Sequence, residues 1–474
     1  GDWCLTTSRT DLVGITSRPM RCELEPEDTV LTSRAFKSLV CVMGLSVFLA
    51  GCSSWLGEDE APPLPGERIS VLALQSTVQP DIDLSDQRVV LPEPEPMVDW
   101  PQNGGFPSHA LHHVGLENDV LEQDWSVSIG DGSMDDNLLL NQAIIARGVI
   151  FTIDASAEVR AFAATSGKEI WSIELAPEDE EDSTLLGGGL AYEKGIIYAT
   201  TGFAEVIAID APSATVLWRQ QVSAPMRSAP TVRGGRVFAI TIDNQTIALN
   251  AMSGELLWSH RGASEGASFI GGASPAVDQG VVISAYSTGE LYALRVENGQ
   301  VIWSDALASA GRTDAVSAIA DIRGLPVIDN DLVFATSNSG LTVGIDLRTG
   351  YRVWELEAGG IQSPWVAGDY IYVLTNTNDL IALRRKTGQV KWVTVLPRFV
   401  DPEDQDEPIV WTGPVLVGDR LIVGNEQGEV MTVSPYSGEI IGKDEVSGPI
   451  TLPPSVAGDS LYFLTADADL IAYR

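Results

Sequence analysis

Side chains that commonly perform catalysis or bind metal are scarce in this sequence, which has four histidines and four cysteines among 474 residues. His109, His112 and His113 are close enough in sequence to suggest a metal cluster, but a spaced fourth ligand does not accompany them, so we expect surface histidines. The glycine runs at residues 187–189 and 271–272 lack the strand-loop-helix context of a phosphate site and are expected to lead into strands. No motif indicates a Ser/His/Asp triad. We therefore predict no catalytic residue, no metal and no cofactor.

The cysteines indicate lipidation. An apolar run at residues 38–48 is followed by Leu-Ala-Gly-Cys at positions 49–52. This pattern resembles bacterial lipoprotein signals, in which the cysteine becomes the first residue of the mature protein and carries acyl chains. Cleavage before Cys52 would leave it as the sole cysteine, which excludes disulfides and thiolate metal sites. Ser53 follows, and in that family a residue other than aspartate here implies sorting to the outer membrane.

Composition divides the chain into four parts. Residues 1–51 form the leader, and residues 1–29 do not fit a signal because acidic residues precede the basic ones, which suggests an over-extended start. Residues 52–98 are rich in proline and acid, which predicts an extended tether. Residues 99–123 are an entry segment, and residues 124–474 are the expected folded body.

The charge of the chain excludes one class of partner. Its 65 acidic and 29 basic residues give a net charge of −36. A nucleic-acid-binding protein needs a basic face to neutralise phosphates, so we exclude nucleic acid as a partner. The 44% of apolar residues and the 45 glycines are typical of a globular, turn-rich protein.

The body consists of a repeated unit of about 44 residues, and such a period is typical of a β-propeller. Its main anchor is a strand that ends in a small residue, and the examples centre on Ala161, Ala208, Ala248, Ala293, Gly344, Ala382, Thr432 and Ala472. A turn and a further strand precede each anchor, and an innermost strand, often opened by proline, precedes that. We therefore expect each unit to form four antiparallel strands, which we name A to D from the axis outward.

Tryptophan marks the outermost strand, D. A turn glycine usually stands four residues before it, as in Gly167 and Trp171, whereas Ala214 takes the glycine's place before Trp218. We interpret the ring as a packing device between adjacent blades that covers the small residue of the neighbouring strand. The docking set is Trp125, Trp171, Trp218, Trp258, Trp303, Trp354 and Trp392.

The two ends of the body complement each other. The last unit stops at residues 470–474 without a strand D, and an orphan D-like strand, residues 124–129, precedes the first unit. Pairing of these ends would leave no free sheet edge at the seam. We therefore predict an all-β, eight-bladed β-propeller of four-stranded blades, closed by an N-terminal strand.

The repeats resemble the tryptophan-docking repeats of pyrroloquinoline-quinone (PQQ) enzymes, and residues 99–105, Asp-Trp-Pro-Gln-Asn-Gly-Gly, resemble the opening of such domains. The resemblance implies a PQQ-dependent periplasmic dehydrogenase as an alternative function. Most alcohol-oxidising members have a vicinal cysteine pair over the cofactor, which the mature chain would lack, and no recognisable set of Asp and Asn ligands for calcium is present in the sequence. A generic ligand-binding or sensing propeller of the envelope is a third alternative.

The links from strand D of one unit to strand A of the next are expected on one face of the ring. Residues 178–186 and 397–411 are acidic and residues 308–325 form an enlarged link. Two acidic links on one rim would produce a negative field that steers a basic partner. Apolar residues in the links predict an exposed patch, and some of them are expected to plug the central channel.

A lipoprotein signal, PQQ-type propeller repeats and the lack of a cofactor set together resemble the BamB family of outer-membrane β-barrel assembly lipoproteins, over the leader and about residues 124–474. The resemblance implies a non-catalytic scaffold that is lipid-anchored in the outer membrane, contacts the membrane only through its lipid and faces the periplasm. It implies that POTRA domains of a BamA-like barrel subunit are the partner, with unfolded outer-membrane proteins as a further one.

The resemblance also implies which links contact the partner, namely residues 267–275 and 318–326. The partner-binding residues that it implies are Phe269, Ile270, Asp321 and Arg323. Ile270 stands where an arginine is common in the family, and Arg323 stands where a second acid is common. These two differences amount to an exchange of charge between the links.

Overall fold

A computed structural model describes residues 78–116, 122–133, 138–177, 187–263, 271–308 and 321–474, all within one compact unit, Val71–Arg474. These residues form strands and loops apart from one short 3₁₀ helix, η2 (Ile82–Leu84). In this part of the chain, no helix has the length and apolar character needed to cross a membrane. The predicted leader and the predicted lipidation site, Cys52, lie outside the described residues.

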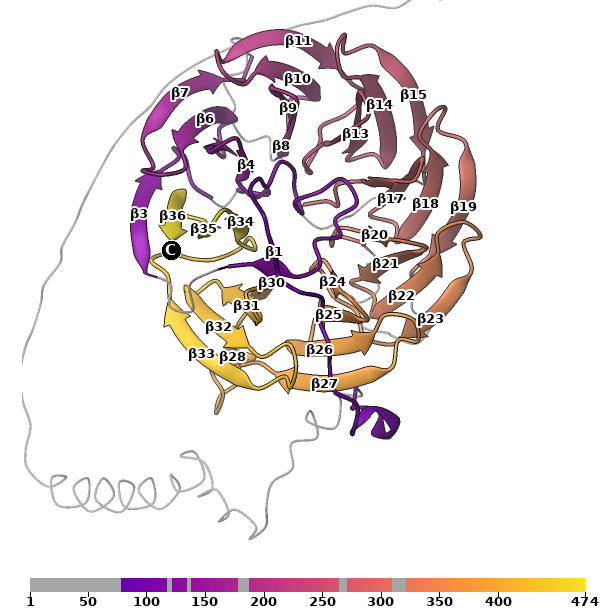
Figure 1. Cartoon of the computed structure of the whole chain (residues 1–474). Coiled ribbons are helices and arrows are strands. Elements are labelled where there is room, and N and C mark those ends of the chain that lie inside the picture. Colours follow the sequence, from indigo (N-terminus) through magenta and orange to yellow (C-terminus); the bar gives the residue numbers. More distant parts are fainter. Residues whose placement is uncertain (1–77, 117–121, 134–137, 178–186, 264–270, 309–320) are drawn as a thin grey trace, which may run out of the picture. The chain divides into compact units, whose positions relative to one another are not determined.

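Antiparallel sheets stand side by side around a central axis, and within each sheet the strands follow one another from the axis outward (Figure 1). The first four sheets in chain order are β4 (Ile144–Ala146), β5 (Val149–Ile153), β6 (Glu158–Ala163) and β7 (Glu169–Glu174); β8 (Gly188–Glu193), β9 (Ile196–Thr201), β10 (Glu205–Asp210) and β11 (Thr215–Gln221); β12 (Thr231–Arg233), β13 (Arg236–Thr241), β14 (Gln245–Asn250) and β15 (Leu256–Arg261); and β16 (Ala276–Asp278), β17 (Val281–Ala285), β18 (Glu290–Arg295) and β19 (Val301–Ala306).

The ring continues with three further sheets. They contain β20 (Val327–Asp329), β21 (Leu332–Ser337), β22 (Leu341–Asp346) and β23 (Arg352–Leu356); β24 (Trp365–Ala367), β25 (Tyr370–Leu374), β26 (Asp379–Arg384) and β27 (Val390–Val395); and β30 (Trp411–Val417), β31 (Arg420–Asn425), β32 (Glu429–Val433) and β33 (Ile440–Glu445). The link between β27 and β30 forms its own two-stranded hairpin of β28 (Phe399–Asp401) and β29 (Asp406–Pro408).

The last sheet combines distant parts of the sequence. Its strands are β34 (Ser455–Ala457), β35 (Ser460–Leu464), β36 (Asp469–Tyr473) and β3 (Gln123–Ser128). β3 pairs antiparallel with β36, with Trp125 opposite Ala472. Two backbone hydrogen bonds of 2.9 Å between Glu122 and Arg474 extend this pairing. The predicted pairing of the N-terminal strand with the last unit is confirmed, as is an all-β propeller of four-stranded units.

Burial differs between the inner strands and the outer strands in the way the sequence pattern requires. All five residues of β25 are buried, whereas β11 alternates between exposed and half-buried residues. An inner strand has neighbours on both faces, so it reads as a continuous apolar run. The outermost strand faces solvent on one side and therefore alternates.

The tryptophans of the outermost strands lie against two sheets at once. Trp258 is opposite Ala248 within its own sheet, and it donates a hydrogen bond of 2.9 Å from Nε1 to the backbone oxygen of Val296 in the next sheet. The ring also covers the turn glycine of that next sheet, since a Cβ on Gly299 would lie 2.5 Å from the indole. The described contact explains why a small residue and a turn glycine recur at these positions.

Residues 78–96, here called the strap, run from the outer edge of β27 inward across one sheet (Figure 1). Asp81 N–H donates a 2.8 Å hydrogen bond to the Val390 oxygen, and Lys391 Nζ donates one of 2.6 Å to the Leu84 oxygen. Leu84 and Val89 are 3% and 7% exposed. Part of the predicted tether, residues 78–98, thus differs from the expectation of a free extended chain, because its apolar side chains are buried against the ring.

Residues 97–114, here called the plug, cross the centre of the ring. A short strand, β1 (Glu95–Pro96), leads into the plug and pairs with β2 (Val114–Gly115), which in turn pairs with β30. Hydrogen bonds join the plug to every four-stranded sheet and to the sheet of β30 to β33, with partners at Ile145, Tyr192, Val232, Val277, Ile328, Trp365, Gly418 and Gly458. The plug therefore closes the axis where the A-to-B turns emerge.

Candidate interaction site around the axial cavity

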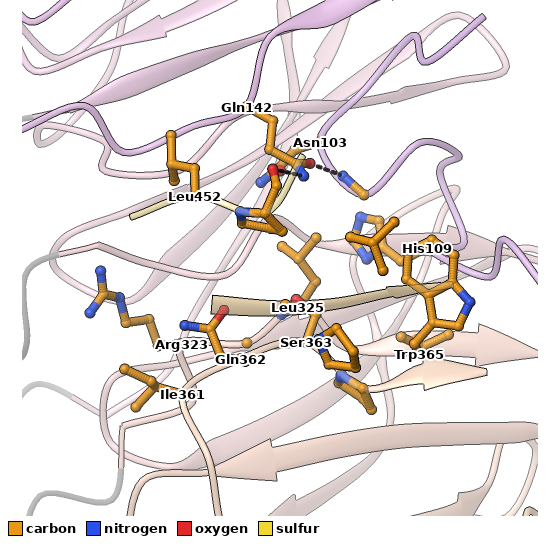
Figure 2. Close-up of a pocket in the computed structure, with 18 of the residues that line it drawn as sticks. Asn103, His109, Gln142, Arg323, Leu325, Ile361, Gln362, Ser363, Trp365 and Leu452 are labelled. Atoms are coloured by element: carbon orange, nitrogen blue, oxygen red, sulfur yellow. Dashed lines mark hydrogen bonds between the residues drawn. The ribbon is translucent and has the colours of Figure 1, made fainter. Parts of the chain in front are cut away.

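A cavity of about 120 Å³ lies on the axis beside the plug, where the D-to-A links enter the innermost strands. Figure 2 shows Arg323 and Ile361 on one side of it, and His109 and Trp365 on the other. Its wall takes residues from several links, including Gln142, Gly271, Gly272, Arg323, Gln362, Ser363 and Thr451, together with Pro414 of β30. The links thus come together at the axis although they are far apart in sequence.

Amide side chains hold the links to the plug. Gln142 accepts a 3.2 Å hydrogen bond from the Gly104 N–H and donates one of 2.8 Å to the Pro453 oxygen. Asn103 donates to Asn141 Oδ1 at 3.2 Å. Amide groups suit this position because each both donates and accepts, so they satisfy backbone groups that no strand pairs. These contacts fix the rim of the cavity.

The three clustered histidines do not form a metal site. His109 and His113 are 6% and 2% exposed, so the expectation of surface histidines was wrong for these two. His109 Nδ1 lies 2.7 Å from the Pro326 oxygen, and burial lowers the pKa of the imidazole from 6.5 to about 4. In the described ranges, no group of three or more His, Cys, Asp or Glu side chains is placed to hold a metal ion.

His113 is a structural histidine of the plug. Its Nε2 accepts a 3.1 Å hydrogen bond from the Asp419 N–H, so its Nδ1–H donates to the Pro92 oxygen at 2.8 Å. The imidazole thereby connects the strap to the sheet of β30. His112, in contrast, has an exposed side chain, 3.5 Å from Asp329.

The two predicted partner links come together. A Cβ on Gly271 would lie 2.8 Å from the Arg323 side chain, so the first link touches the second. Gly271 has a φ of +110°, which favours glycine, and this allows the close approach. Phe269 and Ile270, the two predicted partner-binding residues of the first link, lie outside the described residues.

Asp321 and Arg323 differ in accessibility. Asp321 is 3% exposed, and its backbone oxygen accepts a 2.9 Å hydrogen bond from Asn338. Ile322 is 1% exposed and packs in the core between two sheets. Arg323 is half-buried and lines the cavity; burial lowers the pKa of its guanidinium, and the neighbouring Asp321 opposes this shift. Of these three residues, Arg323 is the one whose side chain reaches the cavity.

The acidic link that the structure describes projects into solvent. The hairpin of β28 and β29 carries Asp401, Glu403 and Asp404, all exposed. A second cavity of about 320 Å³ separates the base of the hairpin from the neighbouring sheet. There, Arg398 lies 3.1 Å from Asp379, and Trp411 is buried with its Nε1 bonded to the Pro397 oxygen at 2.8 Å. The other acidic link, 178–186, lies outside the described residues.

Apolar link residues are divided between core and surface. Leu325 and Trp411 are 8% and 2% exposed, whereas Val400 and Val410 are 48% and 43% exposed. The amides at residues 141, 142 and 362 also belong to the site, although they were not predicted to. No spacing pattern identifies them, because their partners belong to other units. The sequence signal for this rim of the cavity is the proline that opens strand A in several units.

Comparisons with known proteins agree on one family. A family model described as outer membrane protein assembly factor BamB matches residues 155–394. The outer membrane protein assembly factor BamB of Salmonella typhimurium is 29% identical over 355 residues, which are 73% of this chain and 87% of that protein.

Two solved structures share the fold. The crystal structure of BamB from Moraxella catarrhalis matches with a TM-score of 0.62 at 21% identity, over 75% of this chain and 100% of that chain. A europium-containing methanol dehydrogenase matches with a TM-score of 0.61 at 15% identity, over 80% and 89% of the two chains. The family model covers half of the sequence and most of the sheets that form the ring. This chain therefore belongs to the family of the outer membrane protein assembly factor BamB.

Proposed function

We propose that this protein is a non-catalytic scaffold that assists the assembly and insertion of outer-membrane β-barrel proteins. The observation that carries the proposal is the family match over residues 155–394. The relatives are named as assembly factors and not as enzymes. The scaffold is an eight-bladed propeller, in which each sheet of four or more strands is one blade and β3 closes the ring as strand D of the last blade. The seven tryptophans on strands D have the structural role of docking blade to blade.

We assign partner binding to the two links that meet at the axial cavity. The partner is a BamA-like barrel subunit, contacted through its POTRA domains at residues 267–275 and 318–326. Arg323 makes direct contact because it is accessible at the cavity, together with Phe269 and Ile270. Asp321 is 3% exposed, so its role is to shape the link and to hold the Arg323 guanidinium in place through charge. Unfolded outer-membrane proteins are a second class of partner.

The proposed location is the periplasmic side of the outer membrane. Cys52 carries the lipid after removal of residues 1–51, and residues 52–77 then separate the anchor from the strap. A stable anchor requires two or more acyl chains. The strap fixes the point at which the tether leaves the ring, namely the outer edge of β27.

An enzymatic role in quinone chemistry fits the cavity poorly. Calcium, which accompanies the quinone in this resemblance, takes oxygen ligands with carboxylates prominent among them. Among the residues that the structure describes, those that line the cavity include Arg323, amides and apolar side chains, but neither Asp nor Glu. Dehydrogenases with this fold are similar at identities near 15%, which demonstrates shared architecture only. A ligand-binding or sensing propeller is the alternative function, and the absence of a barrel subunit among the co-purified proteins would favour it.

Co-purification tests the proposal. Tagged protein is recovered from gently solubilised envelopes, and the accompanying proteins are identified by mass spectrometry. We expect a barrel subunit with POTRA domains, and we expect Arg323→Glu to reduce its recovery. Arg295→Glu is the matched control, because Arg295 is exposed on β18 away from the links. Equal recovery with both variants would remove Arg323 from the contact, and absence of a barrel subunit from the wild-type sample would overturn the scaffold proposal.

A further inference from the structure

Apolar side chains are exposed where strand D begins in several sheets, on the side of the ring away from the D-to-A links. Leu256 and Leu257 of β15 are 52% and 42% exposed, and Ile440 and Ile441 of β33 are 48% and 55% exposed. Strand D is the edge strand of each sheet, and its outward backbone groups are a template for an additional chain. Clusters of exposed apolar residues commonly mark interaction sites.

One of these edges is already occupied by the protein's own chain. Val390 of β27 stands two residues before its tryptophan, as Leu256 does, yet it is only 4% exposed. The Val390 oxygen accepts a 2.8 Å hydrogen bond from the Asp81 N–H, and the Val390 N–H donates one of 2.7 Å to the Asp81 carboxylate. Leu84 is buried at the same contact. At this edge the chain therefore makes one backbone–backbone hydrogen bond and one through the Asp81 carboxylate, and it covers the apolar residue that begins strand D just before it turns into η2.

The edge of β15 carries a further exposed apolar side chain beside its two leucines. Met252, in the turn before the strand, is 76% exposed and adds a third apolar side chain to Leu256 and Leu257. β33 instead continues into Lys443, Asp444 and Glu445, whereas β15 ends in a single exposed charged residue, Arg261, and charged residues on an edge discourage strand addition. The net charge of −36 disfavours an anionic membrane surface as the occupant.

We propose that the outer edge of β15, at Met252, Leu256 and Leu257, binds an extended apolar segment of an unfolded polypeptide by adding it as a strand. Backbone hydrogen bonds give tolerance of sequence, and alternate apolar side chains of the bound segment cover the two leucines. The inference deepens the proposed binding of unfolded outer-membrane proteins. β15 leads into the first partner link, but Met252, Leu256 and Leu257 lie at the start of the strand, away from that link, so variants at these positions test strand addition separately from the POTRA contact.

The test uses the full folded chain and a fluorescent eight-residue peptide with valine and threonine in alternation. We expect saturable binding, measured by anisotropy, that the double variant Leu256→Ser/Leu257→Ser weakens by about tenfold, a change of about 1.4 kcal/mol. Val98→Ser is the control, since Val98 is 75% exposed but lies outside strand D, and it should bind as the wild type does. Circular dichroism verifies that each variant is folded.

A second peptide with every backbone amide N-methylated separates strand addition from simple apolar contact. It should not bind, because it cannot donate to the strand edge. Equal binding of the two peptides, or equal binding to the double variant and the wild type, would overturn the proposal. Two other outcomes would also overturn it by assigning the edge elsewhere, namely concentration-dependent dimerisation, or binding to neutral lipid vesicles, that the double variant abolishes.

Discussion

Trp303 donates a hydrogen bond of 2.7 Å from its indole Nε1 to the backbone oxygen of Leu347, which belongs to the next sheet of the ring. The same relationship joins Trp171 to Ala211 at 2.9 Å. Each bond reaches a carbonyl at the end of strand C, where no strand pairing is available. The tryptophan thus binds two sheets by apolar contact and by satisfying a backbone group.

Trp125 provides a natural contrast that leads to the first prediction. Its ring packs on Gly167, but its buried Nε1 has no partner among the residues that the structure describes. Trp303→Phe removes a hydrogen bond and leaves the Leu347 oxygen unsatisfied, whereas Trp125→Phe removes ring volume alone. We expect Trp303→Phe to lower the free energy of unfolding by about 1–3 kcal/mol more than Trp125→Phe does. Urea denaturation monitored by fluorescence measures the free energy of unfolding of both variants. Equal losses of stability would mean that the hydrogen bond of Trp303 does not contribute.

The turn glycines give a second prediction. Gly254 and Gly280 have φ values of +73° and +79°, so alanine is strained at both positions. A Cβ on Gly254 would lie 2.7 Å from the Trp218 ring, whereas a Cβ on Gly280 would have no neighbour within 4 Å. We expect Gly280→Ala to cost about 1 kcal/mol from strain and Gly254→Ala to cost about 1–3 kcal/mol more from overpacking. Similar melting temperatures for the two variants would contradict the docking role of the ring.

The plug gives a third prediction, centred on Gln102. This side chain is 4% exposed. It donates a hydrogen bond of 2.9 Å to the Val232 oxygen and accepts one of 2.8 Å from the Val232 N–H. Gln102→Ala leaves both buried backbone groups without a partner, so we expect a loss of about 2–4 kcal/mol in the free energy of unfolding. Gln427→Ala, on an exposed turn, should change it by less than about 0.5 kcal/mol. If Gln102→Ala leaves the free energy of unfolding unchanged, the plug contributes little to the stability of the ring.

His109 gives a fourth prediction, concerning pH. Burial lowers the pKa of its imidazole from 6.5 to about 4, so the folded protein holds it neutral where the unfolded chain takes up a proton. The stability that this neutral group supports is complete above about pH 6.5 and is lost as the pH falls towards 4, by about 3 kcal/mol in total.

His109→Asn is the matched variant, because asparagine tolerates the φ of +60° at this position. The difference in unfolding free energy between wild type and variant should decrease by this amount between pH 7.5 and pH 4, as measured by urea denaturation at each pH. A difference that stays constant with pH would show that His109 is not the titrating group.

The regular part of the fold could be predicted because its determinants are local. A small residue on strand C, a turn glycine and a tryptophan recur at fixed spacing, and each recurs because it touches its neighbour in a short stretch of chain. The pairing of β3 with β36 could be predicted because the last unit lacks a strand D and an unpaired D-like strand precedes the first unit. Even the exception at Ala214 keeps the backbone of the glycine that it replaces, with a φ of +57°.

The plug and the strap could not be predicted, because their partners are distant in sequence and follow no period. Gln102 and Val232 are 130 residues apart, and Asp81 and Val390 are 309 residues apart. The burial of His109 and Asp321 escaped prediction for the same reason, since both depend on segments brought together only in the folded ring. A polar residue in a loop is ordinarily exposed, so the residue types alone predicted that both side chains would be accessible to solvent.

The pairing of β3 with β36 has a consequence for the order of synthesis. A chain that emerges from its N-terminus first exposes β3 and the plug long before β36 exists, so the earliest segment must wait for the latest. The partners of the plug are synthesised one sheet at a time, from Ile145 to Gly458. Until β36 exists, the seam sheet has an open edge that invites wrong pairing. Closure of the ring is thus a late event, and a chain that ends before β36 would leave β3 without its partner strand.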